Sequence, residues 1–302
     1  MRTLFPSREM GEEIWRGCTL KHGMRGLAVF LFLAVGLLRG LALGQAGPPF
    51  RTDDPETPGN GHWEINFGFI ADHNPGGSYY QTPDFDINYG LGDRIQLKYE
   101  LPIALFTDAH NTTLGGLGNS LLGVKWRYYE HRRKGAAAED DKAANFSAST
   151  YPQLSLDNPT GAARRGVVQY RGPMLLLPLE ANARIGWLRL DAEGGYWFGN
   201  RDAPDQWIRG LIAGHELTRR TELYAEIYDQ QDANRIRGLP KQREATLGLG
   251  GRHALNGQGT VNLLFMGGRS FQTVSAASGQ PSWIAYMGLQ VLLGPREPAE
   301  DH

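Results

Sequence analysis

Cysteine is almost absent from this 302-residue chain, and Cys18 is the single one. A fold with one cysteine cannot depend on internal disulfide bonds and offers no cysteine cluster for a zinc site. The eight histidines are scattered and show no metal-ligand spacing. We therefore expect no metal and no cofactor, and a fold held by its hydrogen-bond ladder and packing.

An excess of charge of one sign is also lacking. The chain has 31 lysine and arginine residues against 32 aspartate and glutamate residues, a formal net charge of −1. Without a basic surface, nucleic acid is not an expected partner. The mean hydropathy of −0.40 excludes a protein with many membrane-spanning helices. It remains compatible with a β-barrel, because lipid-facing residues are diluted there by polar lumen and loop residues.

Motifs of catalysis are missing as well. The sequence contains no G-x-S-x-G element, and the glycine cluster at residues 115–120 is not followed by a helical pattern. A nucleophile elbow and a phosphate-binding loop are therefore not expected. Asp72, His73, Asp108 and His110 fall in expected loops, where nothing pairs them. We expect the protein not to be an enzyme.

The N-terminus has the layout of an export signal. Arg25 is followed by an apolar run at residues 27–38 and then by the small residues Ala42, Gly44 and Ala46. This order is typical of a secretory signal peptide. A retained anchor is the alternative, but the run is short for a spanning helix and Arg39 ends it. We expect residues 1–46, an upstream extension with its signal peptide, to be removed.

Glycine is abundant, at 40 residues, and it separates short segments in which apolar and polar residues alternate. Alternation with period two predicts β-strands, and many short strands with glycine turns predict an all-β fold. We expect about twelve strands. They lie at residues 62–69, 85–91, 95–101, 121–129, 151–156, 173–183, 187–198, 207–217, 222–228, 243–255, 260–268 and 283–293.

The connections favour a membrane barrel over a soluble sandwich, which the alternation alone does not separate. Short turns are expected at 91–94, 184–186, 218–221 and 256–257, and long polar connections at 72–81, 103–114, 157–168, 199–206, 229–242 and 270–281. Transmembrane barrels alternate short periplasmic turns with long outer loops in this way. One connection, at 131–150, is long where a short turn is due.

The predicted fold is therefore all-β, a single antiparallel transmembrane β-barrel of about twelve strands at residues 62–293. An irregular lead-in at 47–61 precedes it, and a polar tail at 294–302 follows. Aromatic residues near the strand ends are typical of the interfacial girdles of such barrels. They are Trp63, Tyr89, Trp126, Trp187, Trp197, Trp207 and Trp283.

In a barrel, the polar residues of each alternating strand face the lumen. The candidates that line it are Glu64, Asn66, Asp86, Asn88, Gln96, Lys98, Glu100, Lys125, Arg127, Arg189, Asp191, Glu193, Glu222, Glu226, Glu244 and Arg252. Two interpretations stay open for this mixed-charge set. It forms a polar path that tunes what passes, or it forms a structural ion network that fills a closed barrel.

The lead-in carries Asp53 and Asp54 beside Glu56. A solvated turn next to proline is the favoured interpretation. A cation site or a plug inside the lumen is the alternative.

Several segments together resemble a known family. They are "PPFRTDDPETPGNGHWEINFGF", "YGLGDRIQLKYELP", "GLGNSLLGVKWRYY" and "LSLDNPTG". The pattern, at residues 48–293, is similar to the outer-membrane proteins of the meta-pathway of phenol degradation family. The sequence departs from it at Asn119 and at Asp157 and Asn158. The resemblance implies an outer-membrane β-barrel that passes small compounds, aromatic ones among them.

The expected function is a passive outer-membrane channel or transporter for small molecules, aromatic or hydrophobic ones among them. The alternatives are a closed structural or lipid-interacting barrel, plugged by charge pairs or by residues 47–61, and a soluble periplasmic β-sandwich. The expected location is the outer membrane of a Gram-negative-type bacterium, with membrane lipid and an unidentified solute as partners. The sequence does not set the oligomeric state.

Overall fold

The computed structural model describes residues 47–74, 76–131, 146–159, 165–167, 170–234, 241–272 and 281–294. All of them belong to one compact unit, Arg39–His302. The expected signal peptide, Cys18, the tail after residue 294 and residues 132–145 of the exceptional connection lie outside the described residues. No helix in the described part of the chain is long and apolar enough to cross a membrane.

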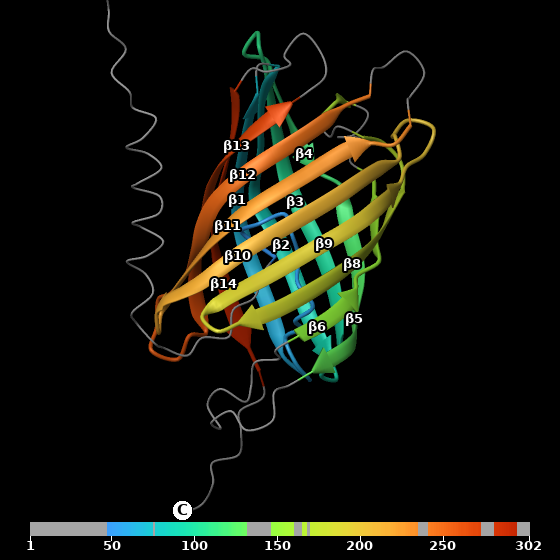
Figure 1. The fold of residues 1–302 in the computed structure, drawn as a ribbon. Helices are drawn as coiled ribbons and strands as arrows, with labels where there is room; N and C mark the ends of the chain where they lie inside the picture. Colours follow the sequence, from blue (N-terminus) through green and yellow to red (C-terminus); the bar gives the residue numbers. More distant parts are fainter. Residues whose placement is uncertain are drawn as a thin grey trace, which may run out of the picture. The chain divides into compact units, whose positions relative to one another are not determined.

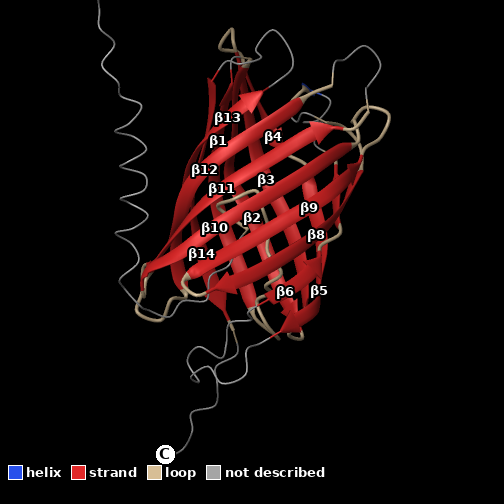
Figure 2. Cartoon of the chain, viewed as in Figure 1, coloured by secondary structure: helices blue, strands red, loops and turns tan. Residues whose placement is uncertain are grey.

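The fold is all-β, as predicted (Figures 1 and 2). The strands are β1 (Trp63–Asn74), β2 (Gly77–Leu91), β3 (Ile95–Asp108), β4 (Thr113–Leu117), β5 (Ser120–His131), β6 (Phe146–Thr150), β7 (Gln153–Leu156), β8 (Met174–Ile185), β9 (Leu188–Phe198), β10 (Gln206–Thr218), β11 (Thr221–Asp232), β12 (Arg243–Ala254), β13 (Val261–Gln272) and β14 (Pro281–Leu293).

The strands form one closed antiparallel sheet. The first strand, β1, pairs with the last, β14, from Trp63 opposite Leu293 to His73 opposite Trp283. Two positions in the wall are each filled by two successive strands, of which β4, β6 and β7 are short. The pair β4 and β5 lies beside β3, and the pair β6 and β7 lies beside β8. The described strands therefore fill twelve positions, which confirms the predicted barrel and excludes two stacked sheets.

The two ends of the barrel differ. At one end, here called the turn end, lie the start of β1, the finish of β14 and the tight connections at 92–94, 186–187 and 219–220. The opposite end, here called the loop end, carries the connections at 157–173, 199–205 and 233–242. Short turns on one side and longer loops on the other are the pattern of outer-membrane barrels.

Two predicted long connections at the loop end are wrong. Strand β1 continues to Asn74 and β2 begins at Gly77, so most of residues 72–81 is sheet. Strand β3 continues to Asp108 and β4 begins at Thr113. In residues 72–81 the strand ends are polar on both faces, which is possible where water reaches both faces above the hydrocarbon. In β3, residues 103–106 are apolar in succession, so they show no period-two alternation.

Strand β6 lies inside the segment predicted as the long connection 131–150. Its residues Ser147 and Ser149 face the interior and are buried. Small side chains such as serine and alanine give little contrast between faces, so period-two alternation could not be seen there.

The exterior of the barrel is apolar and the interior is largely polar, the inverse of a soluble protein. Trp126 is 54% exposed and Leu249 is 70% exposed, whereas Asp191 is completely buried. Leaving one large apolar side chain in water forgoes about 1.5–3 kcal/mol of burial free energy. A closed band of such residues around the barrel therefore identifies the surface that contacts hydrocarbon.

The exposed tryptophans form two groups along the barrel axis. Trp63, Trp126 and Trp187 lie at the turn end, and Trp207 and Trp283 begin strands at the loop end. These are the positions of two interfacial girdles. Trp197 was wrongly placed in this set. Its side chain packs inward against Leu176, Ile208 and Tyr228.

Candidate functional site: the barrel lumen

Residues 47–61, here called the lumen segment, lie inside the barrel (Figure 1, blue). The segment contains four prolines, at positions 48, 49, 55 and 58. Proline lacks the backbone N–H that a central strand must donate, so the segment cannot join the wall as another strand. Its backbone polar groups must find partners among the side chains of the wall.

Carboxylates of the wall supply those partners. The backbone N–H groups of Arg51 and Thr52 both donate to Oε1 of Glu226, at 2.9 and 2.7 Å. The N–H of Asp53 donates to Oε2 of Glu193 at 3.0 Å. Hydrogen bonds from backbone amides to an ionised carboxylate are stronger than neutral ones, so β9 and β11 hold this turn of the segment firmly.

Two buried cations bind the carboxylates of the lumen segment. Lys125 on β5 places Nζ 2.8 Å from Oδ1 of Asp53, and it also donates to the backbone oxygen of Asp54. Arg189 on β9 donates to the carboxylate of Asp54, and its guanidinium lies 3.6 Å from Glu56. The segment is thus fixed to two separate parts of the wall.

Each of these cations also binds a carboxylate of the wall itself. Lys125 lies 3.7 Å from Glu180, and Nε of Arg189 donates to Asp191 at 2.8 Å. A buried cation needs such partners because its desolvation costs several kcal/mol. Each cation therefore binds carboxylates of both the wall and the lumen segment, so the charges of the segment and of the wall stabilise one another.

Asp54 is completely buried, so the favoured prediction of a solvated turn is wrong. Burial raises the pKa of the Asp54 carboxyl, while Arg189 opposes that shift. The two cations offset part of the cost of burying this carboxyl group. The sequence could not reveal this, since Lys125 and Arg189 lie about 70 and 135 positions along the chain from it.

Packing adds to the polar contacts. The ring of Phe50 enters an apolar cluster inside the barrel that includes Ile212, Leu264 and Ile284. On β10, Gly210 lies directly against Thr52, and a Cβ atom at position 210 would be 2.1 Å from the Thr52 hydroxyl oxygen. Glycine is required at 210 because the lumen segment occupies the space of a side chain.

Beyond the segment, side chains fill the lumen toward the turn end. The amide of Asn66 donates to Glu64 at 3.0 Å, and the amide of Gln96 donates to Asn88 at 2.8 Å and to the Tyr151 hydroxyl at 3.0 Å. This network joins β1, β2 and β3 to Tyr151, which lies between β6 and β7. It leaves little room for solute on that side of the interior.

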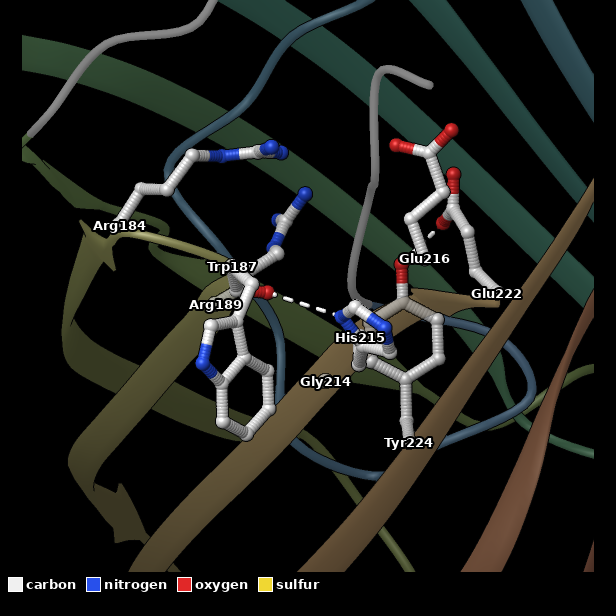
Figure 3. A pocket seen from close by; sticks show the side chains of 8 residues that line it. All are labelled: Arg184, Trp187, Arg189, Gly214, His215, Glu216, Glu222 and Tyr224. Atoms are coloured by element: carbon white, nitrogen blue, oxygen red, sulfur yellow. Dashed lines mark hydrogen bonds between the residues drawn. The ribbon is translucent and has the colours of Figure 1, made fainter. Parts of the chain in front are cut away.

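A small pocket of about 20 Å³ remains at the turn end beside β8 to β11. In Figure 3 the guanidinium groups of Arg184 and Arg189 lie on one side of it, and the carboxylates of Glu216 and Glu222 on the other. His215 donates to the backbone oxygen of Trp187 at 3.1 Å at its edge. The pocket is too small to hold more than a water molecule.

The loop-end half of the lumen is hollow. A cavity of about 900 Å³ lies there, and residues 47–51 and Asp53 of the lumen segment contribute to its lining. Strands β1, β2, β3, β8, β10, β11, β13 and β14 supply most of the rest. A cavity of this size can enclose a drug-sized molecule.

The sixteen predicted lumen residues differ in how deeply they are buried and in whether they line the large cavity. Eleven are buried: Glu64, Asn66, Asp86, Asn88, Gln96, Lys125, Arg189, Asp191, Glu193, Glu222 and Glu226. The others, Lys98, Glu100, Arg127, Glu244 and Arg252, have side chains that are 10–24% exposed. Those that line the large cavity are Asp86, Lys98, Glu100, Glu193 and Glu244. That the set lines a path for solute stays a prediction.

Sequence reasoning missed two groups of residues. The first is the apolar part of the cavity wall, which includes Ile70, Ile208, Met266, Ile284 and Tyr286. Strands β10, β13 and β14 are apolar on both faces, so alternation gave no sign of it. The second is Asp84, which lies two residues before Asp86 and shares its face. Extending the period-two pattern of β2 by one step would have found it.

Among the described residues, no group of three or more histidine, cysteine, aspartate and glutamate side chains is arranged to hold a metal ion. The acidic groups of the lumen are instead distributed among lysine, arginine and backbone N–H partners. The lumen can therefore recognise a molecule through charge and through apolar contact.

The fold is that of known outer-membrane channels. The structure is similar to the COG4313 outer membrane channel from Pseudomonas putida F1, with a TM-score of 0.59 and 13% identity over 82% of this chain and 100% of that chain. It is also similar to the NanC porin, with a TM-score of 0.50 and 6% identity over 76% of this chain and 98% of that chain. No protein-family model and no curated protein sequence matches the chain.

Proposed function

We propose that this protein is a passive outer-membrane channel for small molecules, closed in the present conformation by the lumen segment. One observation carries the proposal: a cavity of about 900 Å³ lies inside a closed barrel, and an irregular chain segment contributes to its lining. The segment is bound by side-chain contacts and not by a strand ladder. Such contacts can break and re-form without unfolding the wall.

Passage requires the lumen segment to leave its place or to shift. Its ion pairs with Lys125 and Arg189 cross from the segment to the wall. When the segment leaves, both cations keep a wall partner in Glu180 and Asp191. The open state therefore does not leave either cation without a counter-charge, which lowers the cost of opening.

The proposed location is the outer membrane, with the loop end outward, the turn end in the periplasm and residues 1–46 removed on export. Lipid around the exposed apolar band and a small solute in the lumen are the proposed partners. The fold similarity to outer-membrane channels supports this location. The finer assignment to the meta-pathway family rests on the sequence resemblance, and with it a preference for aromatic or hydrophobic solutes.

Planar-bilayer conductance and liposome swelling test the proposal. The full chain, purified from membranes, is compared with a variant that lacks residues 48–57, and heat modifiability on gels checks that each barrel is folded. We expect the deletion to raise conductance and solute permeation strongly. A folded deletion variant that conducts no ions and passes no solute would reject the channel function.

The second candidate is a closed structural or lipid-interacting barrel. The observation that favours it is the packed turn-end half, where buried side chains such as Asn66, Gln96 and Tyr151 bind one another. That network stays in place when the lumen segment is deleted. Continued closure of the deletion variant is the outcome that this candidate predicts. In neither case is the protein proposed to be an enzyme.

A further inference from the structure

Carboxylates outnumber cations around the large cavity. Its lining contains seven acidic side chains, namely Asp53, Asp72, Asp84, Asp86, Glu100, Glu193 and Glu244, and two basic ones, namely Arg51 and Lys98. Lys125 does not line the cavity but binds Asp53, so three basic side chains lie in or next to the lining. The cavity as a whole is therefore acidic, although the complete chain is almost neutral.

The known pairs account for part of this excess. Arg51 lies 3.6 Å from Asp72 and 3.2 Å from Glu244. Lys98 lies 3.2 Å from Asp86 and 2.9 Å from Glu100. Each of these two cations thus binds two carboxylates. Asp84 lies beside the second group, and no lysine or arginine in the described part of the chain forms an ion pair with it.

Asp84 is 6% exposed, and among the described residues no donor lies within hydrogen-bonding distance of its Oδ1. A buried carboxyl oxygen that lacks a hydrogen-bond partner costs about 1–3 kcal/mol. Native structures rarely keep such a group without a reason, and an absent ligand is one. Asp84 also lines the cavity, so its carboxyl group borders the space where a solute would lie.

A bulge in β2 gives Asp84 this direction. The register of β2 against β3 shifts between Gln81 and Asp84, so residues on both sides of the shift, Tyr79 and Gln81 above it and Asp84 below it, line the cavity. Bulges commonly re-aim side chains next to functional sites. The carboxylate and the Tyr79 ring are thereby brought to one wall.

Aromatic and apolar groups complete the surroundings. Tyr286 lies against the barrel wall, where Gly68 and Gly288 leave space for its ring, and a Cβ at either glycine would approach the ring or its hydroxyl within 3.0 Å. Phe106 and Ile284 line the same cavity. Aromatic faces attract cations and bind apolar groups equally well, so they suit a molecule that has both.

We infer that the cavity binds small organic cations that carry an apolar or aromatic group, with Asp84 and Glu100 facing the charge. This inference rests on the proposed function, because it takes the cavity to be part of the path for solute. An anion is disfavoured by the surplus of carboxylates. An inorganic metal ion is disfavoured because the described carboxylates form no ligand set for one and half of the wall is apolar.

Calorimetric titration of the purified full chain in detergent tests the inference with three probes of similar shape: benzylammonium, benzyl alcohol and benzoate. We expect benzylammonium to bind, and benzyl alcohol and benzoate to bind at least about tenfold more weakly. Asp84→Asn and Glu100→Gln should each weaken benzylammonium binding about five- to tenfold and leave benzyl alcohol unchanged.

The matched control is Asp202→Asn, which removes an exposed carboxylate at the loop end outside the cavity. It should leave all three affinities within about twofold. Equal binding of the three probes, or an Asp84→Asn variant that binds benzylammonium as the wild type does, would overturn the inference. A calcium titration that displaces benzylammonium stoichiometrically at lower concentration would also overturn it, in favour of a metal ion.

The titration separates this inference from the channel function, since it needs no conduction. If benzylammonium binds selectively but the folded deletion variant of the lumen segment stays closed, the site stands and the channel fails. If the deletion variant conducts but binds the three probes equally and shows no preference for benzylammonium over benzoate in reversal potential, the channel stands and the cation site fails.

Discussion

The two halves of the lumen contain the same types of charged residue, but these residues have different roles in the two halves. At the turn end, Lys125 and Arg189 are each surrounded by carboxylates of the wall and of the lumen segment, and the space is filled. At the loop end, Lys98 serves Asp86 and Glu100, Asp84 lacks a hydrogen bond on one oxygen, and the space is hollow.

The difference shows what a charge inside a barrel does. Where each buried charge has partners at short range, the charges hold an element in place, and the free energy of closure depends on them. Where carboxylates are in excess and a cavity is present, the unmatched charge becomes a preference for what enters. The composition of a mixed-charge lumen therefore does not show whether the lumen is a path or is plugged. That depends on which charged side chains form ion pairs with one another.

Asp54→Asn is the change with the largest expected effect on this contrast. It removes a carboxylate of the lumen segment that binds Arg189 and lies beside Lys125, without altering the barrel wall. Hydrogen bonds to charged groups contribute about 1.5–3 kcal/mol, so the open fraction should rise roughly 10- to 100-fold. Planar-bilayer recordings measure it as open probability.

Asp202→Asn, the exposed control, should leave the open probability unchanged. If Asp54→Asn also leaves it unchanged in a barrel that is still heat-modifiable, the ion pairs at the turn end do not hold the segment closed, and the contrast between the halves has no functional meaning.

Gly210→Ala should have a smaller effect of the same sign. The added methyl group would lie 2.1 Å from the Thr52 hydroxyl oxygen and within 2.9 Å of two of its carbon atoms, so the lumen segment must shift. Overpacking of this kind costs about 1–3 kcal/mol. Because an irregular segment can shift to relieve the contact, we expect a cost at the low end of that range and a rise in open probability of about five- to tenfold. Gly194→Ala is the matched control, since a Cβ there meets nothing within 4 Å.

The pair of alanine variants separates a steric effect from a general effect of alanine in a strand. Equal conductance of the Gly210→Ala and Gly194→Ala proteins would mean that Thr52 does not lie against β10 in the membrane.

Lys98→Gln probes the loop-end half and should have the smallest effect on conductance. It removes the cation that serves Asp86 and Glu100, so the cavity becomes more acidic. We expect the cation-to-anion permeability ratio, measured from reversal potentials, to rise about two- to threefold while open probability stays the same. Lys241→Gln, at an exposed loop-end position outside the cavity, should change neither quantity. A fall in the ratio would contradict the acidic character of this half.

The sequence revealed most of the wall of the barrel. Strands such as β3, β5 and β11 carry large apolar side chains on one face and charges on the other, and this contrast is a direct record of hydrocarbon outside and polar groups inside. No sequence motif marks the pairing of β1 with β14. The pairing can still be expected, because an open sheet of this kind would leave two unpaired edge strands and a closed barrel leaves none.

The contents of the lumen could be predicted only in part. The residues of the wall follow from period two, which is why Lys125, Arg189 and Glu226 were on the list of candidates. The lumen segment is irregular and has no period, and its partners are distant in the sequence. The acidic pair Asp53 and Asp54 has the sequence of an ordinary solvated turn, and only the buried cations opposite it distinguish it.

The apolar side of the cavity could not be predicted for a different reason. Ile208, Met266 and Tyr286 lie on strands whose outward residues are apolar too, so the two faces could not be told apart. Only the register of the closed sheet assigns these side chains to the interior.

The central claim is that the lumen segment and the wall side chains that bind it fill the turn-end half, while the loop-end half stays open to solute. Single cysteines placed in a Cys18→Ser background test it, one at the completely buried Thr52 and one at Ser155 in the cavity wall. Both are exposed to a small methanethiosulfonate reagent in intact outer membranes. The account predicts that Ser155→Cys reacts and that Thr52→Cys is protected until Asp54→Asn is added. Equal reaction rates at the two positions in the otherwise native protein would contradict it.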